Sequence, residues 1–277
     1  ATLGDNKTVF TKFNNPEKNL SNHYEGKVLG EIWGYRVDGL FASDEEAAEY
    51  TSKINQDAVN ERILTDKVDP YYRAGDLKFR DLDGDNVISK GDDTAYDAGD
   101  REIIGNETPR YMYSFRLGAD WNGFDLGIFF QGVGKRDWYP NYLSTGFWGP
   151  YSRAFTSFIP ENFMDQCWSE ENRDGYFPRF RGYQTFAGSQ LGVNNDRYLQ
   201  DASYIRLKNL TVGYTLPVLK KVFTKLRVYF TGENLWYWSP MLKHTKYIDP
   251  EAAGGNGNTG MAYNYSRNFS VGVDITF

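Results

Sequence analysis

The stretch YMYSFRLGADWNGFDLGIFFQGVG, residues 111–134, decides the fold of this chain of 277 residues. Apolar and polar residues alternate on both sides of Asn122 and Gly123, a dipeptide typical of a type I′ turn between two β-strands. A two-residue turn fixes which residues lie opposite one another. One face would carry the pairs Trp121 and Phe124, Ala119 and Leu126, Leu117 and Ile128, and Phe115 and Phe130; the other would carry Ser114 and Gln131, Arg116 and Phe129, and Gly118 and Gly127. The segment therefore predicts a hairpin with two chemically different faces.

The last eleven residues, RNFSVGVDITF, alternate without a break. One face would carry Phe269, Val271, Val273, Ile275 and Phe277. A closed barrel in an outer membrane requires such strands, because each strand faces lipid on one side and water on the other. A half-exposed strand of a soluble sheet has the same pattern, so both interpretations stay open at this point.

Further strands are predicted in three places. Residues 204–215 change phase near Lys208 and Asn209, which indicates a β-bulge. Residues 226–230 alternate, and residues 27–41 are rich in strand-forming residues but contain several glycines. With the hairpin and the final strand, we expect six barrel strands.

Connection lengths favour the membrane barrel. If the final strand runs toward the periplasm, the turn at 122–123 and the connection at 217–223 lie on that side, and both are short. The connections at 42–110, 138–202 and 239–266 then lie outside, and all are long. Outer-membrane barrels have short inner turns and long outer loops. A large soluble β-domain, such as a sandwich, is the alternative.

Composition excludes some classes of protein. Aromatic residues make up 17% of the chain, which suits aromatic girdles or stacking surfaces. A net charge of −6 without a basic stripe excludes nucleic acid as an expected partner. Cys167 is the single cysteine, so an internal disulfide is impossible. His23 and His244 lie far apart in the sequence and outside any metalloenzyme spacing, and we expect no enzyme activity.

The first long connection contains DLDGDNVISKGD, residues 81–92, with the spacing of an EF-type calcium loop. The predicted ligands are Asp81, Asp83, Asp85, the carbonyl of Val87, and Asp92. Asn86 replaces the usual glycine but tolerates the left-handed conformation, and Asp92 is shorter than the usual glutamate. An ion-free acidic turn is the alternative to bound Ca²⁺.

The second long connection is rich in aromatic residues. Trp138, Trp148, Tyr151 and Trp168 are candidate substrate-binding residues, because flat rings beside polar groups stack on sugars or grip extended peptides. The alternative is a connection that packs on itself and closes the mouth of the barrel.

Several blocks of the chain, in the same order, resemble a known family. They are GEIWGYRVDGLF (30–41), GDLKFRDLDGDNVIS (75–89), REIIGNETPRYMYSFRLGADWNGFDLGIFFQGVG (101–134), YLQDASYIRLKNLTVGYTLP (198–217), TGENLWYWSP (231–240) and the terminal strand. Together they resemble the C-terminal part of SusC/RagA-type TonB-dependent outer-membrane transporters.

The resemblance implies an all-β fold: the C-terminal segment of a 22-stranded antiparallel transmembrane β-barrel with long extracellular loops. It also implies an N-terminal plug, a SusD-like surface lipoprotein, and import of oligosaccharides or peptides with energy relayed by TonB. Phe277 would belong to the signal read by the barrel-assembly machinery. The plug, the TonB-contacting segment and the other strands have no counterpart in residues 1–277, so we expect this chain to be one portion of the barrel. The remaining plug and barrel would complete its open edges, since unpaired backbone groups in lipid are costly.

Two other classes of function remain as alternatives. The first is a secreted, calcium-stabilised, carbohydrate-binding β-sheet module, in which residues 81–92 and the tryptophans would be the active features. The second is an outer-membrane enzyme, which would need a hydrolytic arrangement that two isolated histidines do not provide.

Overall fold

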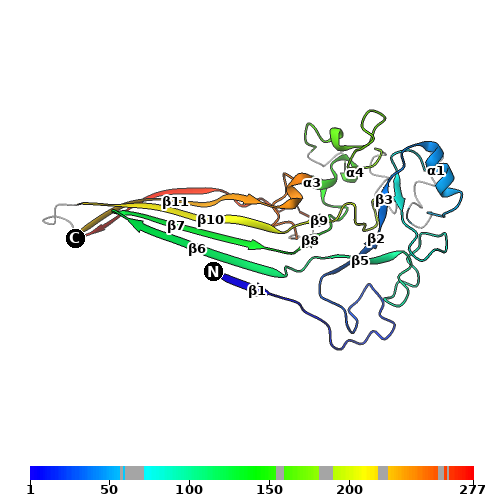
Figure 1. Ribbon diagram of the computed structural model, residues 1–277, viewed down its shortest axis with the longest axis horizontal. Coiled ribbons are helices and arrows are strands. Elements are labelled where there is room, and N and C mark those ends of the chain that lie inside the picture. Colours follow the sequence, from blue (N-terminus) through cyan, green and yellow to red (C-terminus); the bar gives the residue numbers. More distant parts are fainter. Residues whose placement is uncertain are drawn as a thin grey trace.

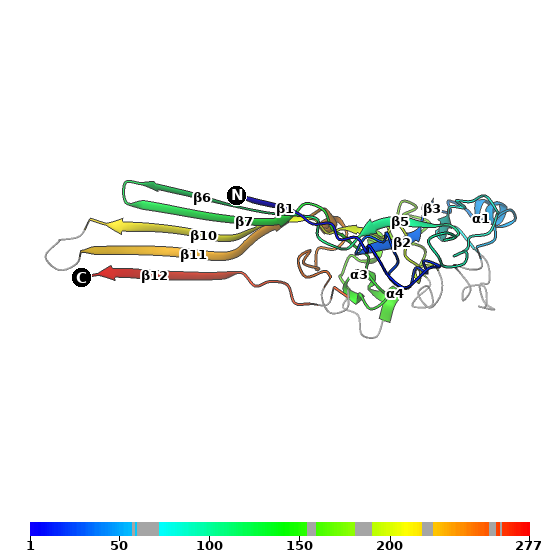
Figure 2. The same cartoon turned by 90° about the horizontal axis from the view of Figure 1, so that it is seen from below.

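The computed structural model describes residues 1–56, 59, 72–153, 159–180, 190–217, 224–254, 259–260 and 262–277. Its main feature is a six-stranded sheet that extends away from a rounded body at one end (Figures 1 and 2). We call this sheet the wall. Its strands are β1 (Thr2–Asp5), β6 (Tyr111–Trp121), β7 (Phe124–Val133), β10 (Tyr204–Leu216), β11 (Lys225–Trp238) and β12 (Asn268–Thr276). The described residues among 6–110, 134–203 and 239–267 form the other part, which we call the loop body.

The strands of the wall are antiparallel, in the order β1-β6-β7-β10-β11-β12. The hairpin of β6 and β7 has the predicted register, with Trp121 opposite Phe124 and Leu117 opposite Ile128. Asn122 and Gly123 have φ values of 48° and 85°, as a type I′ turn requires. The predicted β-bulge is also confirmed, because the register of β10 shifts between Leu207 and Asn209 against both of its neighbours.

The prediction that residues 27–41 form a wall strand is wrong. They form two short strands of the loop body, β2 (Glu31–Tyr35) and β3 (Val37–Leu40). Ile32, Gly34 and Tyr35 are all buried, so this segment is covered on both faces and lacks the exposed row of a wall strand. The sixth wall strand is β1, whose four residues are too few to show an alternating pattern.

The loop body consists of small sheets and short helices around one core. β2 pairs with β5 (Arg101–Asn106), β3 with β4 (Leu77–Phe79), and β8 (Asp137–Trp138) with β9 (Gln200–Asp201). The helices are α1 (Asp44–Thr51), α3 (Thr145–Trp148), α4 (Pro150–Arg153) and the 3₁₀ turns η1 (Met164–Gln166) and η3 (Pro240–Lys243). α1 begins after its N-cap Ser43: Ser43 Oγ accepts from the N–H of Glu46, and the Glu46 carboxylate accepts from the N–H of Ala42.

The connections of the wall are sorted by length, as predicted. The links from β1 to β6, β7 to β10 and β11 to β12 all leave the wall at the loop body (Figure 1). The β6–β7 turn, the end of β10 at Leu216, the start of β11 at Lys225 and the C-terminus lie at the far end (Figure 1). Residues 218–223, between β10 and β11, lie outside the described residues. Among the described helices, none has the length and apolar character that a membrane span requires.

Candidate functional site

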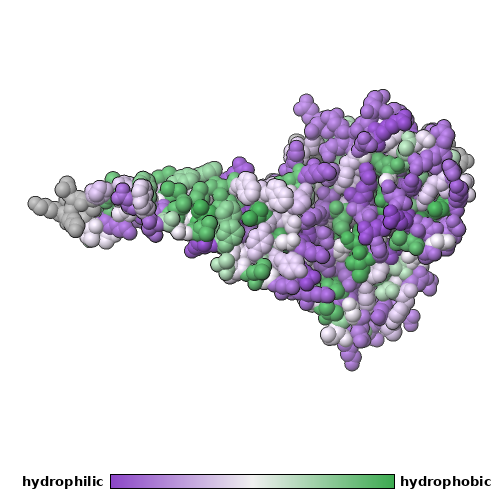
Figure 3. Space-filling model, in the orientation of Figure 1, coloured by the Kyte–Doolittle hydropathy of each residue, from purple (hydrophilic) through white to green (hydrophobic). Residues whose placement is uncertain are grey.

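One face of the wall is apolar and exposed. The register places Ala119, Leu126, Val212, Phe230 and Val271 side by side across five strands. Neighbouring rows on this face also consist mainly of apolar side chains. Figure 3 shows hydrophobic side chains gathered over the wall and polar side chains over much of the loop body. Side chains of this apolar face that are at least half exposed include Leu117, Trp121, Phe124, Val271, Val273 and Phe269.

The height of the apolar face matches a membrane. Trp121 marks the end near the turn, and the row of Tyr113 and Trp238 marks the end near the loop body. Eight residues separate Tyr113 from Trp121 along β6, about 27 Å at about 3.4 Å per residue. Apolar bands of outer-membrane barrels are about 25 Å tall, with aromatic residues at both borders. Trp121 and Trp238 are 76% and 55% exposed, as expected for such border residues.

The opposite face carries small and polar side chains. One row consists of Gly118, Gly127, Thr211, Thr231 and Ser270, and the hydroxyls of Thr211 and Thr231 lie 3.2 Å apart. This face therefore suits water rather than lipid.

Charges on this polar face form a network near the turn. Arg227 on β11 reaches across β10 to Asp125 on β7, with N···O distances of 2.6 and 2.8 Å, and also pairs with Asp274 on β12 at 3.0 Å. Gly213 on β10 makes this possible, because a Cβ there would lie 2.3 Å from Asp125 Oδ2. The network joins strands β7, β11 and β12.

The four aromatic residues predicted to bind substrate are buried inside the loop body. Trp138, Trp148 and Tyr151 are at most 1% exposed, and Trp168 is 5% exposed. Trp148 Nε1 donates to the carbonyls of Pro140 and Asn141, and the Tyr151 hydroxyl donates to the carbonyl of Pro178. This arrangement fits the alternative, a connection that packs on itself. Ligand contact by these residues stays a prediction.

The predicted calcium loop brings together a different set of carboxylates. Asp81 and Asp83 lie with Asp100 so that one oxygen of each is within 4.8 Å of the others. Asp100 lies beyond the motif, and its two oxygens accept the N–H groups of Leu82 and Ser89 at the two ends of the turn. For this reason the motif did not reveal the contact. Ca²⁺ binding by the predicted ligands stays a prediction.

Other features of this loop agree with the motif. Asn86 has a φ of 65°, the left-handed conformation that its position requires, and Ile88 is fully buried as the apolar anchor. Burial raises the pKa of Asp100, and the nearby negative charges of Asp83 and Asp81 raise it further. Three hard oxygen donors that repel one another fit a divalent cation such as Ca²⁺.

We expect removal of calcium to lower the stability of this loop. A ligand that binds only the folded state adds about 2.7 kcal/mol at a hundredfold excess over its dissociation constant. Hydrogen exchange at the amides of Gly84 and Asn86, which donate to Asp81, should quicken when chelator is added and slow again with Ca²⁺. Asp83→Asn should abolish this response and the exposed Asp165→Asn should not; a wild type indifferent to chelator would refute the calcium prediction.

Two groups that could carry chemistry in other proteins are buried or half-buried here. Burial raises the pKa of the Cys167 thiol, the opposite of what a nucleophilic thiolate needs. His244 stacks on Tyr176 with ring centroids 3.6 Å apart, and burial lowers its pKa to about 4. Both side chains therefore act as neutral packing groups near pH 7.

A buried ion pair joins the connection between β11 and β12 to strand β10 of the wall. No sequence pattern indicated this pair. Arg206 of β10 pairs with Asp249, and each side chain is 1% exposed. Glu251 lies 3.0 Å from Arg206 Nε and 2.9 Å from Lys208 Nζ. The ring of Tyr237 lies 4.6 Å from the guanidinium of Arg206.

The curated proteins that resemble this chain in sequence share one name, TonB-dependent receptor. No protein-family model matches the chain. TonB-dependent receptor P3 of Formosa agariphila is 30% identical over 91% of this chain, and TonB-dependent receptor P26 of the same bacterium is 28% identical over 73%. The chain covers 22% and 20% of these two proteins, so it spans about a fifth of the length of the curated relatives it matches.

Solved structures share the fold. The RagAB peptide transporter has a TM-score of 0.56 and 21% identity, with 98% of this chain and 25% of that chain covered. The RagAB peptide importer in its open-open state has a TM-score of 0.54 and 20% identity, with 98% and 24% covered. These likenesses establish an all-β fold similar to the wall and loops of that protein. The relative that is 30% identical over 91% of this chain shows that the chain belongs to the TonB-dependent receptor family.

Proposed function

We propose that this chain forms part of the barrel wall and outer loops of an outer-membrane transporter that imports nutrients. The observation that carries the proposal is the two-faced wall: an exposed apolar face of about 27 Å backed by a polar face. Lipid would cover the first face, and the water-filled or plugged lumen would lie against the second. The long connections gathered at one end would then form the extracellular mouth.

Several finer features belong to the same proposal. The similar structures are named as a peptide importer and a peptide transporter, which supports peptides as cargo. Oligosaccharides are the other cargo that the family resemblance implies. A SusD-like lipoprotein would cover the mouth, and TonB would supply energy through a plug. Within the described residues β1 and β12 each pair with one strand, so further strands of the barrel would complete both edges. Phe277, 85% exposed at the far end of the wall, would serve in barrel assembly.

The secreted binding module fits the structure less well. A soluble protein rarely exposes a large contiguous apolar surface, and here five strands contribute to one. The tryptophans that would hold its sugar are buried.

A pair of adjacent substitutions tests the proposal. Leu210→Arg places a charge on the apolar face, in the row of Leu117 and Ile128 midway between its two borders, and Thr211→Arg places the same charge on the polar face of the same strand. In a membrane the first should cost about 2–4 kcal/mol, while the second should have little effect on folding. The yield of folded, heat-modifiable transporter in the outer membrane measures both. Equal yields of the two variants, or a wild type that stays monodisperse without detergent, would overturn the proposal.

A further inference from the structure

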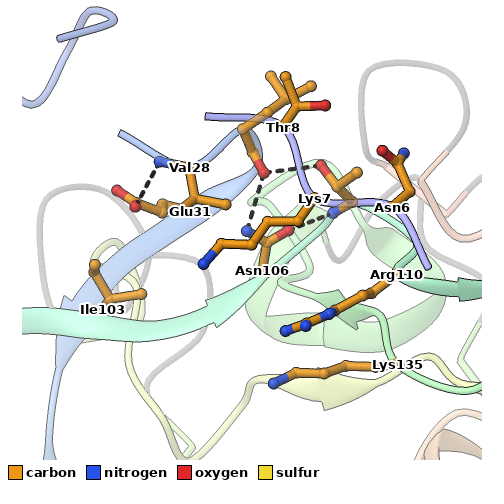
Figure 4. Close-up of a pocket in the computed structure, with 11 residues that line it drawn as sticks. Asn6, Lys7, Thr8, Val28, Glu31, Ile103, Asn106, Arg110 and Lys135 are labelled. Carbon is orange, nitrogen blue, oxygen red and sulfur yellow. Dashed lines mark hydrogen bonds between the residues drawn. The ribbon is translucent and has the colours of Figure 1, made fainter. Parts of the chain in front are cut away.

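A pocket of about 210 Å³ lies where the segment after β1 runs beside the loop-body ends of β6 and β7. Figure 4 shows three basic side chains at this pocket, with Arg110 and Lys135 side by side and Lys7 above them. Their charged ends point toward the side of the pocket on which Ile103 lies. The pocket is separate from the buried aromatic core and from the acidic loop, so neither of these accounts for it.

The pocket lies on the side of the polar face of the wall. The N–H of Arg110 donates to the carbonyl of Lys135 at 2.9 Å, and this pair continues the β6–β7 ladder beyond the ends of the two strands. Residues an even number of positions apart along a strand share a face, so this pair lies on the face of Ser114 and Gln131. In the proposed barrel the pocket would therefore open toward the lumen at its outer end, where cargo enters.

Two of the positive charges at the pocket have no ion-pair partner among the described residues. The side chains of Lys7 and Lys135 are exposed and make neither a hydrogen bond nor an ion pair there. Arg110 differs, because it pairs with Asp5 at 2.9 Å between Nε and Oδ1. The two lysines are therefore the groups that an incoming anion would meet.

The acidic residue in the lining is already engaged. Glu31 accepts hydrogen bonds from the Val28 N–H at 2.8 Å and the Tyr24 hydroxyl at 2.9 Å. Three basic side chains thus face two carboxylates, those of Glu31 and Asp5, and the site keeps a net positive charge in a chain whose net charge is −6. A carboxylate could bond both lysines without displacing an internal ion pair.

Polar uncharged side chains form a second part of the lining. Asn6 and Thr8 have exposed side chains that make no hydrogen bond within the described part of the chain, so they offer donors and acceptors to a peptide group. Asn106 and Thr108 are engaged, because both donate to the carbonyl of Leu29 at 3.0 Å. The pocket therefore holds free hydrogen-bonding groups beside its free charges.

The third part of the lining is aliphatic. Val28 is half-buried, and Leu29 and Ile103 are 39% and 48% exposed. None of the described lining residues carries an aromatic ring, so the pocket lacks the flat surface on which sugars stack. The last residue of a peptide carries its carboxylate and its side chain on one Cα, so it can meet the lysines and the aliphatic residues together. This lining favours a peptide C-terminus over an oligosaccharide.

We propose that the pocket at Lys7, Arg110 and Lys135 binds the C-terminal carboxylate of an imported peptide at the outer end of the lumen. This inference rests on the proposed transport function and names peptides as its cargo. Lys7 and Lys135 form charge-assisted hydrogen bonds with the carboxylate, and Asn6 and Thr8 bond the last peptide group. Arg110 keeps its internal partner and adds to the positive potential, and the aliphatic residues contact the last side chain of the peptide.

The test uses the full transporter in detergent and isothermal titration calorimetry. The probe is the acetylated peptide Ac-Gly-Ser-Gly-Ser-Gly-Leu, once as the free acid and once as the C-terminal amide, so that the two forms differ only at the terminal group. The wild type should bind the free acid about tenfold more tightly, because two exposed lysine–carboxylate pairs contribute up to about fivefold each. The double variant Lys7→Gln with Lys135→Gln should bind both forms with the same weak affinity.

Matched variants separate the site from general charge. Lys12→Gln with Lys246→Gln removes two exposed lysines that do not line the pocket and should leave the preference for the free acid unchanged. Lys7→Arg with Lys135→Arg keeps the charge and should keep the preference. Loss of the preference in the first of these variants would contradict the assignment to this pocket.

Three further results would overturn the inference. Equal affinity for the two forms, or no binding of either, in a wild type that needs detergent would overturn this inference alone and leave the proposed function in place. An amidated peptide with an internal aspartate that binds as tightly as the free acid would assign the pocket to acidic side chains. Trigalacturonate that binds more tightly than the free acid, and loses this affinity in the double glutamine variant of the pocket, would assign the pocket to an acidic glycan.

Discussion

Replacing Arg206 with methionine should release residues 239–254 from the wall. Arg206 and Asp249 are each 1% exposed, so the variant leaves the Asp249 carboxylate buried without its partner. Breaking a buried ion pair from one side costs about 3–5 kcal/mol. The cost should fall on this connection, because it is the segment that the pair fastens to β10.

Hydrogen exchange reports this local effect. The amides of Ile248 and Ala252 donate to the carbonyls of Thr245 and Asp249 at 3.1 and 3.0 Å. Their exchange should quicken by about 150- to 5,000-fold, the factor that corresponds to the loss of about 3–5 kcal/mol. Unchanged exchange at both amides would show that the pair does not fasten the connection.

Two controls separate the buried pair from charge in general. The double variant Arg206→Met with Asp249→Leu should regain much of the protection, because replacing both partners removes the stranded charge. Arg173→Met breaks an ion pair whose two side chains are 60% and 63% exposed, and should cost at most about 1 kcal/mol.

The wall could be predicted from the sequence where the alternation is long and the turn is short. Asn122 and Gly123 fix the register of the first hairpin, and a shift of one residue would exchange the apolar and polar faces. The wrong prediction at residues 27–41 arose because that segment has no regular alternation and was assigned from its composition. That segment has the composition of a strand, but buried residues such as Ile32 and Tyr35 lie on both of its faces. Composition alone does not distinguish a strand that is buried on both faces from a strand with one face toward lipid.

The functional residues could be predicted less well, because they depend on contacts between distant segments. Asp100 joins Asp81 and Asp83 from outside the calcium motif. Arg206 and Asp249 are 43 residues apart and belong to no motif. Spacing along the chain carries no information about such sites, whereas it does define a turn or a strand.

Replacing Trp148 with alanine should destabilise the loop body by about 3–5 kcal/mol, the usual cost of deleting a fully buried tryptophan. Its ring is completely buried and lies 4.6 Å from Phe147 and 5.1 Å from Tyr198, centroid to centroid. The variant also removes the donor to the Pro140 and Asn141 carbonyls. Urea unfolding followed by near-ultraviolet circular dichroism should show a lower midpoint.

This variant also decides between the two interpretations of the aromatic connection. Trp148 as a core residue predicts a lower urea midpoint, with any loss of ligand affinity following from the damaged fold. Trp148 as a stacking surface predicts weaker ligand binding at an unchanged midpoint, because a side chain that contacts ligand adds little to the packing of the free protein. Tyr142→Ala is the control, since its ring is 56% exposed in the same connection and surface substitutions usually change stability by less than about 0.5 kcal/mol. A midpoint that falls for Trp148→Ala and stays constant for Tyr142→Ala would identify Trp148 as a core residue of the loop body, whereas an unchanged midpoint for both variants would contradict this.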